Sequence, residues 1–188
     1  MNAPLNLRLD KASFTAWLDR QDRKYEWKEG RVVQMSNVTK AHARLVSNVL
    51  RAFSARLDLD MWAVTASDLG VEDTGWLRFP DVIVEPMDGD DKARRAQQAA
   101  VIVEVLSPSS VGIDMTEKPE EYATIATLNA YVVASQDEPI LWLWQRDPQT
   151  GHFPAKPIEI NGREQTLTLT FGSLSIPLAE IYRGIAQN

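Results

Sequence analysis

The sequence predicts one α/β (α+β) domain, spanning residues 1–188 and built around a mixed β-sheet. The run Ala100–Leu106 is apolar except for Glu104, a pattern typical of a central strand buried on both faces of a sheet flanked by helices. Helical periodicity in residues 39–57 and several short β-prone runs accompany it. With 188 residues, 44% of them hydrophobic, the chain is long enough to bury a substantial core.

A short helix and a hairpin are predicted at the start of the chain. Leu9–Arg20 carries apolar residues on one side, and Asp10 or Ser13 can cap the helix. Two β-prone runs, Tyr25–Trp27 and Arg31–Met35, flank a turn that ends in a glycine. This pattern favours an N-terminal β-hairpin.

A long amphipathic helix and two strands are predicted next. Apolar residues recur at three-to-four spacing through Thr39–Leu57, and Thr39 is a suitable N-cap. Met61–Ala66 and Phe79–Glu85 are strand-like, with a glycine-punctuated loop between them. The polar segment Met87–Gln98 is expected to be a loop or a short exposed helix.

Two helices and three strands are predicted after the central strand. The helix is expected over Thr116–Leu128, with Thr116 as the cap and a proline tolerated in its first turn. Ala130–Ala134 and Ile140–Gln145 are strand-like, and the alternation in Thr166–Phe171 predicts a hairpin strand. Leu178–Ile185 is expected to form a last short helix.

Composition excludes several kinds of protein. There is no cysteine, so disulfides and thiolate metal sites are excluded. No apolar run is long enough for a membrane helix and residues 1–10 do not resemble a signal peptide, so we expect a cytoplasmic protein. A net charge of −6 disfavours non-specific coating of nucleic acid but suits a carboxylate cluster that holds a cation. No nucleophile elbow surrounds Ser107, Ser109 or Ser110, which disfavours a serine hydrolase.

Glu104 is the first candidate site residue, because an unpaired carboxylate in a buried strand costs several kcal/mol, on the order of the penalty for a buried ion. A cation partner, a bound metal or a position at the open end of the strand would each explain it. Asp81 begins the preceding strand, so adjacent strands could bring both carboxylates to one edge of the sheet. Asp81, Glu104 and the carbonyl of Val105 would then suit Mg²⁺. The alternative for Asp81 is a turn or cap residue.

Four other residues are weaker candidates, each with an ordinary structural alternative. Lys118 can reach back to Glu104 or can be a solvated lysine in the first turn of its helix. His42 lies on the apolar stripe of its helix and can be a core histidine. Glu26 points away from its two aromatic neighbours, toward either solvent or the site. Asp114 can pair with Lys118 or be a simple loop residue.

These residues resemble a known pattern, the Uma2 family of putative restriction endonucleases. The resemblance covers most of the chain, from Phe14 to Val133, and continues more weakly to Ile181. The most specific match is the run Glu104–Ser109 followed by Asp114 and Lys118. The other matching residues are Tyr25, Glu26, Gly30, Val33, Met35, His42, Pro80, Asp81 and Tyr122.

The resemblance implies a PD-(D/E)xK nuclease fold, which is a restriction-endonuclease-like mixed sheet flanked by helices. It implies Asp81 and Glu104 as metal-binding carboxylates. The usual lysine position holds Leu106, so Lys118 on the following helix would replace it. Glu26 and His42 match family positions and become further catalytic candidates.

The implied function is hydrolysis of DNA phosphodiester bonds by an endonuclease that depends on Mg²⁺ (or Mn²⁺). The alternative is a nuclease-fold protein with little or no turnover that binds nucleic acid or protein. We expect a homodimer, because duplex cleavage needs two scissions and two-fold dimers are the commonest oligomers. The cations available to contact phosphate are Arg44, Arg51, Arg78, Lys92, Arg94 and Arg95.

Overall fold

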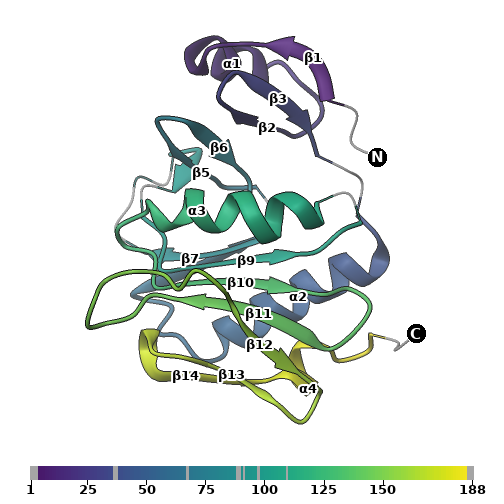
Figure 1. Ribbon diagram of the computed structural model, residues 1–188, viewed down its shortest axis with the longest axis vertical. Coiled ribbons are helices and arrows are strands. Elements are labelled where there is room, and N and C mark those ends of the chain that lie inside the picture. Colours follow the sequence, from purple (N-terminus) through teal and green to yellow (C-terminus); the bar gives the residue numbers. More distant parts are fainter. Residues whose placement is uncertain are drawn as a thin grey trace.

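The computed structural model describes residues 4–35, 38–66, 68–87, 90, 92–96, 98–108 and 110–185, so Ser109 lies outside the described residues. These described residues form two six-stranded sheets and a two-stranded ribbon, with helices between and beside them. In Figure 1 the N-terminal sheet lies at the top, the central sheet in the middle and the two-stranded ribbon at the bottom. The fold is therefore a mixed α+β arrangement, as the sequence predicts.

The central sheet carries the predicted core strand. Its strands, in spatial order, are β12 (Ile158–Asn161), β11 (Ile140–Gln145), β10 (Ala130–Ala134), β9 (Val101–Val105), β7 (Val82–Pro86) and β4 (Trp62–Ala66). β9 and β10 are parallel, and the other neighbours are antiparallel. All five residues of β9 are buried, which confirms the prediction of a central strand covered on both faces.

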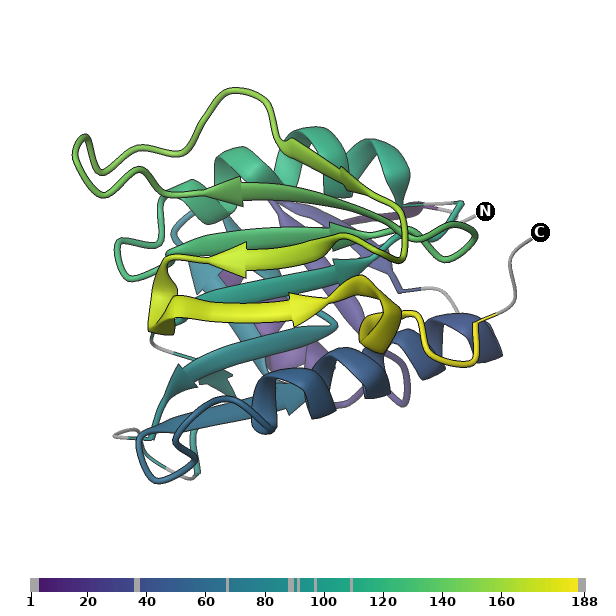
Figure 2. The same cartoon turned by 90° about the horizontal axis from the view of Figure 1, so that it is seen from below.

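One helix covers each face of this sheet (Figure 2). α2 (Lys40–Ser54) packs on the face that bears Val101 and Val103 of β9. Ile102 belongs to the opposite face, in a cluster that includes Tyr122 of α3 (Lys118–Ala123). Because side chains alternate along a strand, Glu104 shares the face of Ile102 and points toward α3.

The N-terminal sheet lies beyond α3 (Figure 1). Its strands, in spatial order, are β1 (Pro4–Arg8), β3 (Arg31–Gln34), β2 (Tyr25–Lys28), β6 (Trp76–Arg78), β5 (Gly70–Asp73) and β8 (Arg95–Ala96). Tyr25 and Trp27 of β2 pack in a cluster with Phe14 of α1 (Lys11–Leu18). The alternation along β2 therefore directs Glu26 away from α1, toward α3 and the central sheet.

The C-terminal segment completes the core on the α2 side. β13 (Thr166–Leu169) and β14 (Leu174–Pro177) form an antiparallel ribbon, followed by α4 (Leu178–Ile181). Leu167, Ile176 and other residues of this segment join the cluster that contains α2 and the central sheet. The predicted hairpin strand is thus confirmed, and the last helix is shorter than expected.

Several other predictions are confirmed or corrected. The side chains of Asp10 and Thr39 cap α1 and α2, as expected. The segment predicted as a loop after β4 contains the hairpin β5–β6. Thr116 is no cap: it lies inside a π-helical turn, Ile113–Glu117, that leads directly into α3. This helix ends at Ala123, five residues before the predicted end. The strands β1, β8 and β12 were not predicted; they contain only five, two and four residues.

None of the helices in the described ranges is both long enough and apolar enough to span a membrane.

Candidate active site

Asp81 immediately precedes β7, and Glu104 lies in β9, the strand that pairs with β7. Val82 of β7 pairs with Val103 of β9, so Asp81 enters β7 at the end of the sheet where Glu104 lies. Asp81 also accepts a hydrogen bond of 2.7 Å from the backbone N–H of Val105. The two carboxylates are both buried and lie at the same end of the central sheet, as the sequence predicts.

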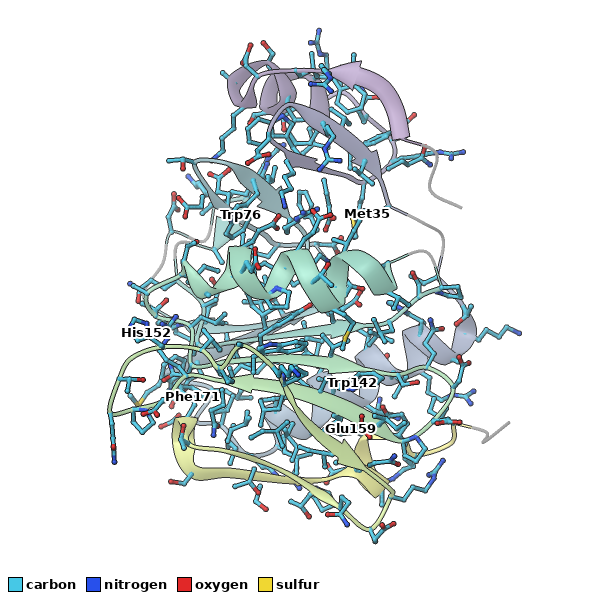
Figure 3. All side chains as sticks on the ribbon, in the orientation of Figure 1. Met35, Trp76, Trp142, His152, Glu159 and Phe171 are labelled. Carbon is cyan, nitrogen blue, oxygen red and sulfur yellow. The ribbon has the colours of Figure 1, made fainter. Side chains whose placement is uncertain are left out.

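Both carboxylates line a hollow of about 490 Å³. It lies where the end of β3, the start of α2, the end of β9 and the π-helical turn meet; Met35, labelled in Figure 3, marks its β3 side. All five predicted catalytic residues contribute to its lining: Glu26, His42, Asp81, Glu104 and Lys118. Other lining residues include Thr39, Val105, Asp114 and Gln136.

Lys118 is the cation partner of Glu104. Its Nζ lies 2.7 Å from Glu104 Oε1 and 2.8 Å from Asp114 Oδ1, and the lysine is only 5% exposed. Tyr122, one helical turn further along α3, donates a hydrogen bond of 2.9 Å to the same Glu104 oxygen. The buried carboxylate is therefore explained both by a cation partner and by its position at the end of the strand.

Proton affinity in this cluster depends on burial and on the surrounding charges. Burial raises the pKa of Glu104 to about 8 although the Lys118 ammonium opposes the rise. The carboxylates of Asp114, Asp81 and Glu26 reinforce it. For Lys118, burial disfavours the ammonium, but Glu104, Glu26 and Asp114 outweigh that effect and hold its pKa well above the ordinary value. Lys118 is therefore an ammonium at neutral pH.

His42 contacts the other carboxylate. Its Nε2 lies 3.0 Å from Asp81 Oδ1, while its buried Nδ1 has no hydrogen-bond partner among the described residues. Thr39 caps the start of α2 through the His42 N–H, and its hydroxyl donates to Gln136 Oε1 at 2.5 Å. Gln136 in turn donates to the carbonyl of Leu106, just after β9. These bonds tie the start of α2, and so His42, to the end of the strand that bears Glu104.

Glu26 connects the N-terminal sheet to the site. Its Oε1 lies 3.7 Å from Lys118 Nζ, and its Oε2 accepts a hydrogen bond of 3.0 Å from Arg78. Arg78 is 1% exposed and binds both carboxylate oxygens of Glu121, at 2.7 and 2.8 Å. Lys28 reaches Glu121 as well, at 2.8 Å. A buried ion-pair network thus joins β2 and β6 to α3 and fixes Glu26 beside Lys118.

The expected set of phosphate-contacting cations is only partly suited to that role. Arg78 is excluded, because it is buried and its guanidinium binds two carboxylates. Arg94 and Arg95 line a different, larger hollow of about 940 Å³. Among the described lining residues of the hollow at Asp81, Lys118 is the one lysine or arginine.

The sequence does not predict the contacts that Tyr122, Arg78 and Glu121 make at the site. Tyr122 follows Lys118 by four residues, so shared helical phase was a usable signal, but an aromatic residue on a helix usually packs in a core. Arg78 lies in the short, largely apolar run Trp76–Phe79, where a buried cation requires a partner. The sequence does not indicate that Glu26 and Glu121 are those partners, because they are 52 and 43 residues away.

The residues present fit a hard divalent cation. Asp81 and Glu104 carry the carboxylate oxygens that such an ion prefers, and acidic side chains outnumber Lys118 in the lining of the hollow. Because the N–H and C=O of one residue in a strand point to the same side, the Val105 carbonyl points toward the Asp81 side of β9. Within the described chain no group of three or more His, Cys, Asp or Glu side chains is arranged to hold a metal. Two carboxylates and water ligands are nevertheless a common set for Mg²⁺.

Two proteins of known sequence are similar to this chain over much of its length. The chain is 26% identical over 182 residues to the uncharacterized protein slr1290 of Synechocystis sp., covering 95% of this chain and 94% of that one. It is 27% identical over 128 residues to the uncharacterized protein sll1609 of the same organism, covering 64% and 72%.

The fold is shared with a solved structure. The crystal structure of a putative nuclease belonging to DUF820 from Anabaena variabilis superposes with a TM-score of 0.78. The alignment covers 95% of this chain and 99% of that chain at 12% sequence identity, so the likeness concerns the fold. The family model for Uma2, described as putative restriction endonuclease, matches residues 12–179. The chain therefore belongs to the Uma2 family.

Proposed function

We propose that the protein is a metal-dependent endonuclease that hydrolyses phosphodiester bonds of DNA at the hollow between Asp81 and Glu104. The observation that carries the proposal is that Asp81 and Glu104 line one hollow at the end of the central sheet, with the Lys118 ammonium 2.7 Å from Glu104. Membership of a family described as putative restriction endonuclease supports the choice of DNA as substrate.

Asp81, Glu104 and the Val105 carbonyl would hold Mg²⁺ or Mn²⁺. Such an ion supplies an activated water and polarises the phosphate when bound. The protein's own residues orient the reactants. Lys118, kept as an ammonium by the carboxylates around it, would donate hydrogen bonds to the attacking water and offset negative charge on the phosphate. His42 would hold Asp81 in place through the 3.0 Å contact at Oδ1.

Glu26 has a supporting role in this proposal. It lies 3.7 Å from Lys118 and is fixed by Arg78, so it keeps a negative charge beside the ammonium. When a metal ion binds Glu104, Glu26 and Asp114 would still hold Lys118 at the site. Lys118 would thus stay in place both with and without the metal ion.

Cleavage of supercoiled plasmid DNA tests the proposal. We expect wild type to nick or linearise the plasmid with Mg²⁺ or Mn²⁺ and to stop when chelator is added. An Asp81→Ala variant that melts like wild type should lose the activity. DNA binding without cleavage in either metal would instead favour the alternative function, a binding protein that retains the nuclease fold.

A further inference from the structure

Two donors hold the same oxygen of Glu104. Lys118 Nζ lies 2.7 Å and the Tyr122 hydroxyl 2.9 Å from Oε1. None of the described residues forms a hydrogen bond with Oε2. The carboxylate is thus fixed through one oxygen, and the other oxygen remains available to the hollow that Glu104 lines.

Of these two donors, Tyr122 is the more rigidly placed. Its side chain is fully buried, and its ring makes edge-on contacts with Trp76 at 5.6 Å and with Tyr131 at 5.1 Å between centroids. Figure 3 labels Trp76 on the N-terminal sheet beside α3. A packed phenol ring has only its O–H left to rotate, whereas the lysine chain has four rotatable carbon–carbon bonds. Tyr122 therefore defines where Oε1 lies.

We propose that Tyr122 is a positioning residue of the site, whose hydroxyl fixes Glu104 so that Oε2 is presented to a divalent cation shared with Asp81. The inference rests on the proposed function and adds a residue to it. Outer partners that orient a ligand carboxylate typically contribute about 10–100-fold to metal affinity or activity. Tyr122 acts through Glu104 and need not touch the DNA.

A matched pair of substitutions tests this inference. Tyr122→Phe removes one oxygen atom and keeps the ring packing. Tyr131→Phe makes the same change in the adjacent, equally buried ring, whose hydroxyl donates instead to the backbone carbonyl of Asp114. Titration calorimetry of the full chain with Mn²⁺ gives the dissociation constant, and plasmid cleavage at several Mn²⁺ concentrations gives the rate.

We expect Tyr122→Phe to weaken Mn²⁺ binding about tenfold or more. Its cleavage rate should fall at low Mn²⁺ and recover as Mn²⁺ is raised. Tyr131→Phe should bind Mn²⁺ within about twofold of wild type, because its hydroxyl does not contact Glu104. A merely structural role for Tyr122 would lower the melting temperature without changing the metal dependence of the rate.

Three outcomes would overturn the inference. The first is a Tyr122→Phe variant with wild-type Mn²⁺ affinity and rate while wild type is active, which leaves the proposed function standing. The second is an equal loss of Mn²⁺ affinity in both variants, which would show a general packing effect. The third is a wild-type protein that neither binds Mn²⁺ nor cleaves DNA, which would overturn the proposed function as well.

Discussion

Lys118 and Glu104 form a buried ion pair, with 2.7 Å between Nζ and Oε1, at the end of the central sheet. The lysine also lies 2.8 Å from Asp114, so one ammonium contacts two buried carboxyl groups. Removing that ammonium leaves negative charges with little access to water. The pair therefore contributes to the stability of the fold as well as to the candidate site.

Lys118→Met tests the contribution of this pair to stability. Breaking a buried pair by removing one partner costs about 3–5 kcal/mol in known cases, and we expect a loss of that order in the free energy of unfolding. Urea denaturation at neutral pH measures it. Lys156→Met, at an exposed position, is the control and should change the unfolding free energy little. Equal, small effects in both variants would show that Lys118 is not a structural cation.

In the absence of metal, the Glu104→Gln variant should gain stability relative to wild type as the pH rises. The pKa of Glu104 is about 8 in the folded protein against an ordinary value of 4.5. Between pH 4.5 and pH 8, the Glu104 carboxyl is protonated in the folded protein but ionised in the unfolded chain. The free energy of unfolding of wild type therefore falls with rising pH, by up to about 1.4 kcal/mol per pH unit. Glutamine has no such titration.

The test of the Glu104 prediction is urea denaturation of both proteins at pH 5, 6.5 and 8 with chelator, and again with saturating Mn²⁺. Metal should stabilise wild type by mass action and the variant much less. A variant that is equally and strongly destabilised at every pH would mean that the carboxylate serves mainly as the structural partner of Lys118. Equal stabilisation of both proteins by Mn²⁺ would exclude Glu104 as a ligand.

Arg78→Met should lower the free energy of unfolding far more than Arg56→Met. Arg78 is buried between Glu26 and Glu121, and its loss leaves two buried carboxylates, at a cost of about 3–5 kcal/mol. Arg56 forms a partly exposed pair with Glu180 at 2.7 Å, worth about 0–1 kcal/mol. Comparing the two unfolding free energies checks the prediction. Similar losses would contradict the assigned role of the buried network.

We also predict a homodimer, since cutting both strands of a duplex requires two sites. Light scattering at micromolar concentration measures the mass in solution. A dimer of about 42 kDa follows from the chain mass of 21.1 kDa. A mass of 21.1 kDa at that concentration would contradict the prediction.

The part of the fold that depends on local patterns could be predicted from the sequence. The unbroken apolar run of β9 indicates a strand buried on both faces, and the apolar stripe after Thr39 indicates α2 and its cap. The burial of Glu104 and its need for a partner follow from that same strand. Alternation along β2 places the Glu26 side chain on the face of the strand opposite Tyr25 and Trp27. The sequence does not show that this face packs on α3 and reaches the site.

The rest depends on contacts between distant residues. β12 and β1 lie at sheet edges and contain only four and five residues, a length at which alternation alone does not distinguish a strand from a loop. The π-helical turn before α3 has no side-chain cap that marks its start, and the prediction of Thr116 as the cap is therefore wrong. Arg78 was assigned to phosphate because its sequence neighbours do not reveal Glu121, whose carboxylate it binds through two nitrogens.

The rate of DNA cleavage by Asp81→Asn tests the central claim most directly. The substitution keeps the shape of the side chain and removes its charge, so it should disturb the fold and the contact with His42 less than Asp81→Ala does. Asp60→Asn, at an exposed position outside the hollow, is the matched control. At saturating Mg²⁺ and with DNA in excess, we predict that Asp81→Asn lowers the rate at least about 100-fold, because losing the charge of a ligand should cost more than the roughly 10–100-fold loss seen when an outer partner of a ligand is removed. Asp60→Asn should keep the wild-type rate. Cleavage by Asp81→Asn at the wild-type rate would contradict the assignment of hydrolysis to this site.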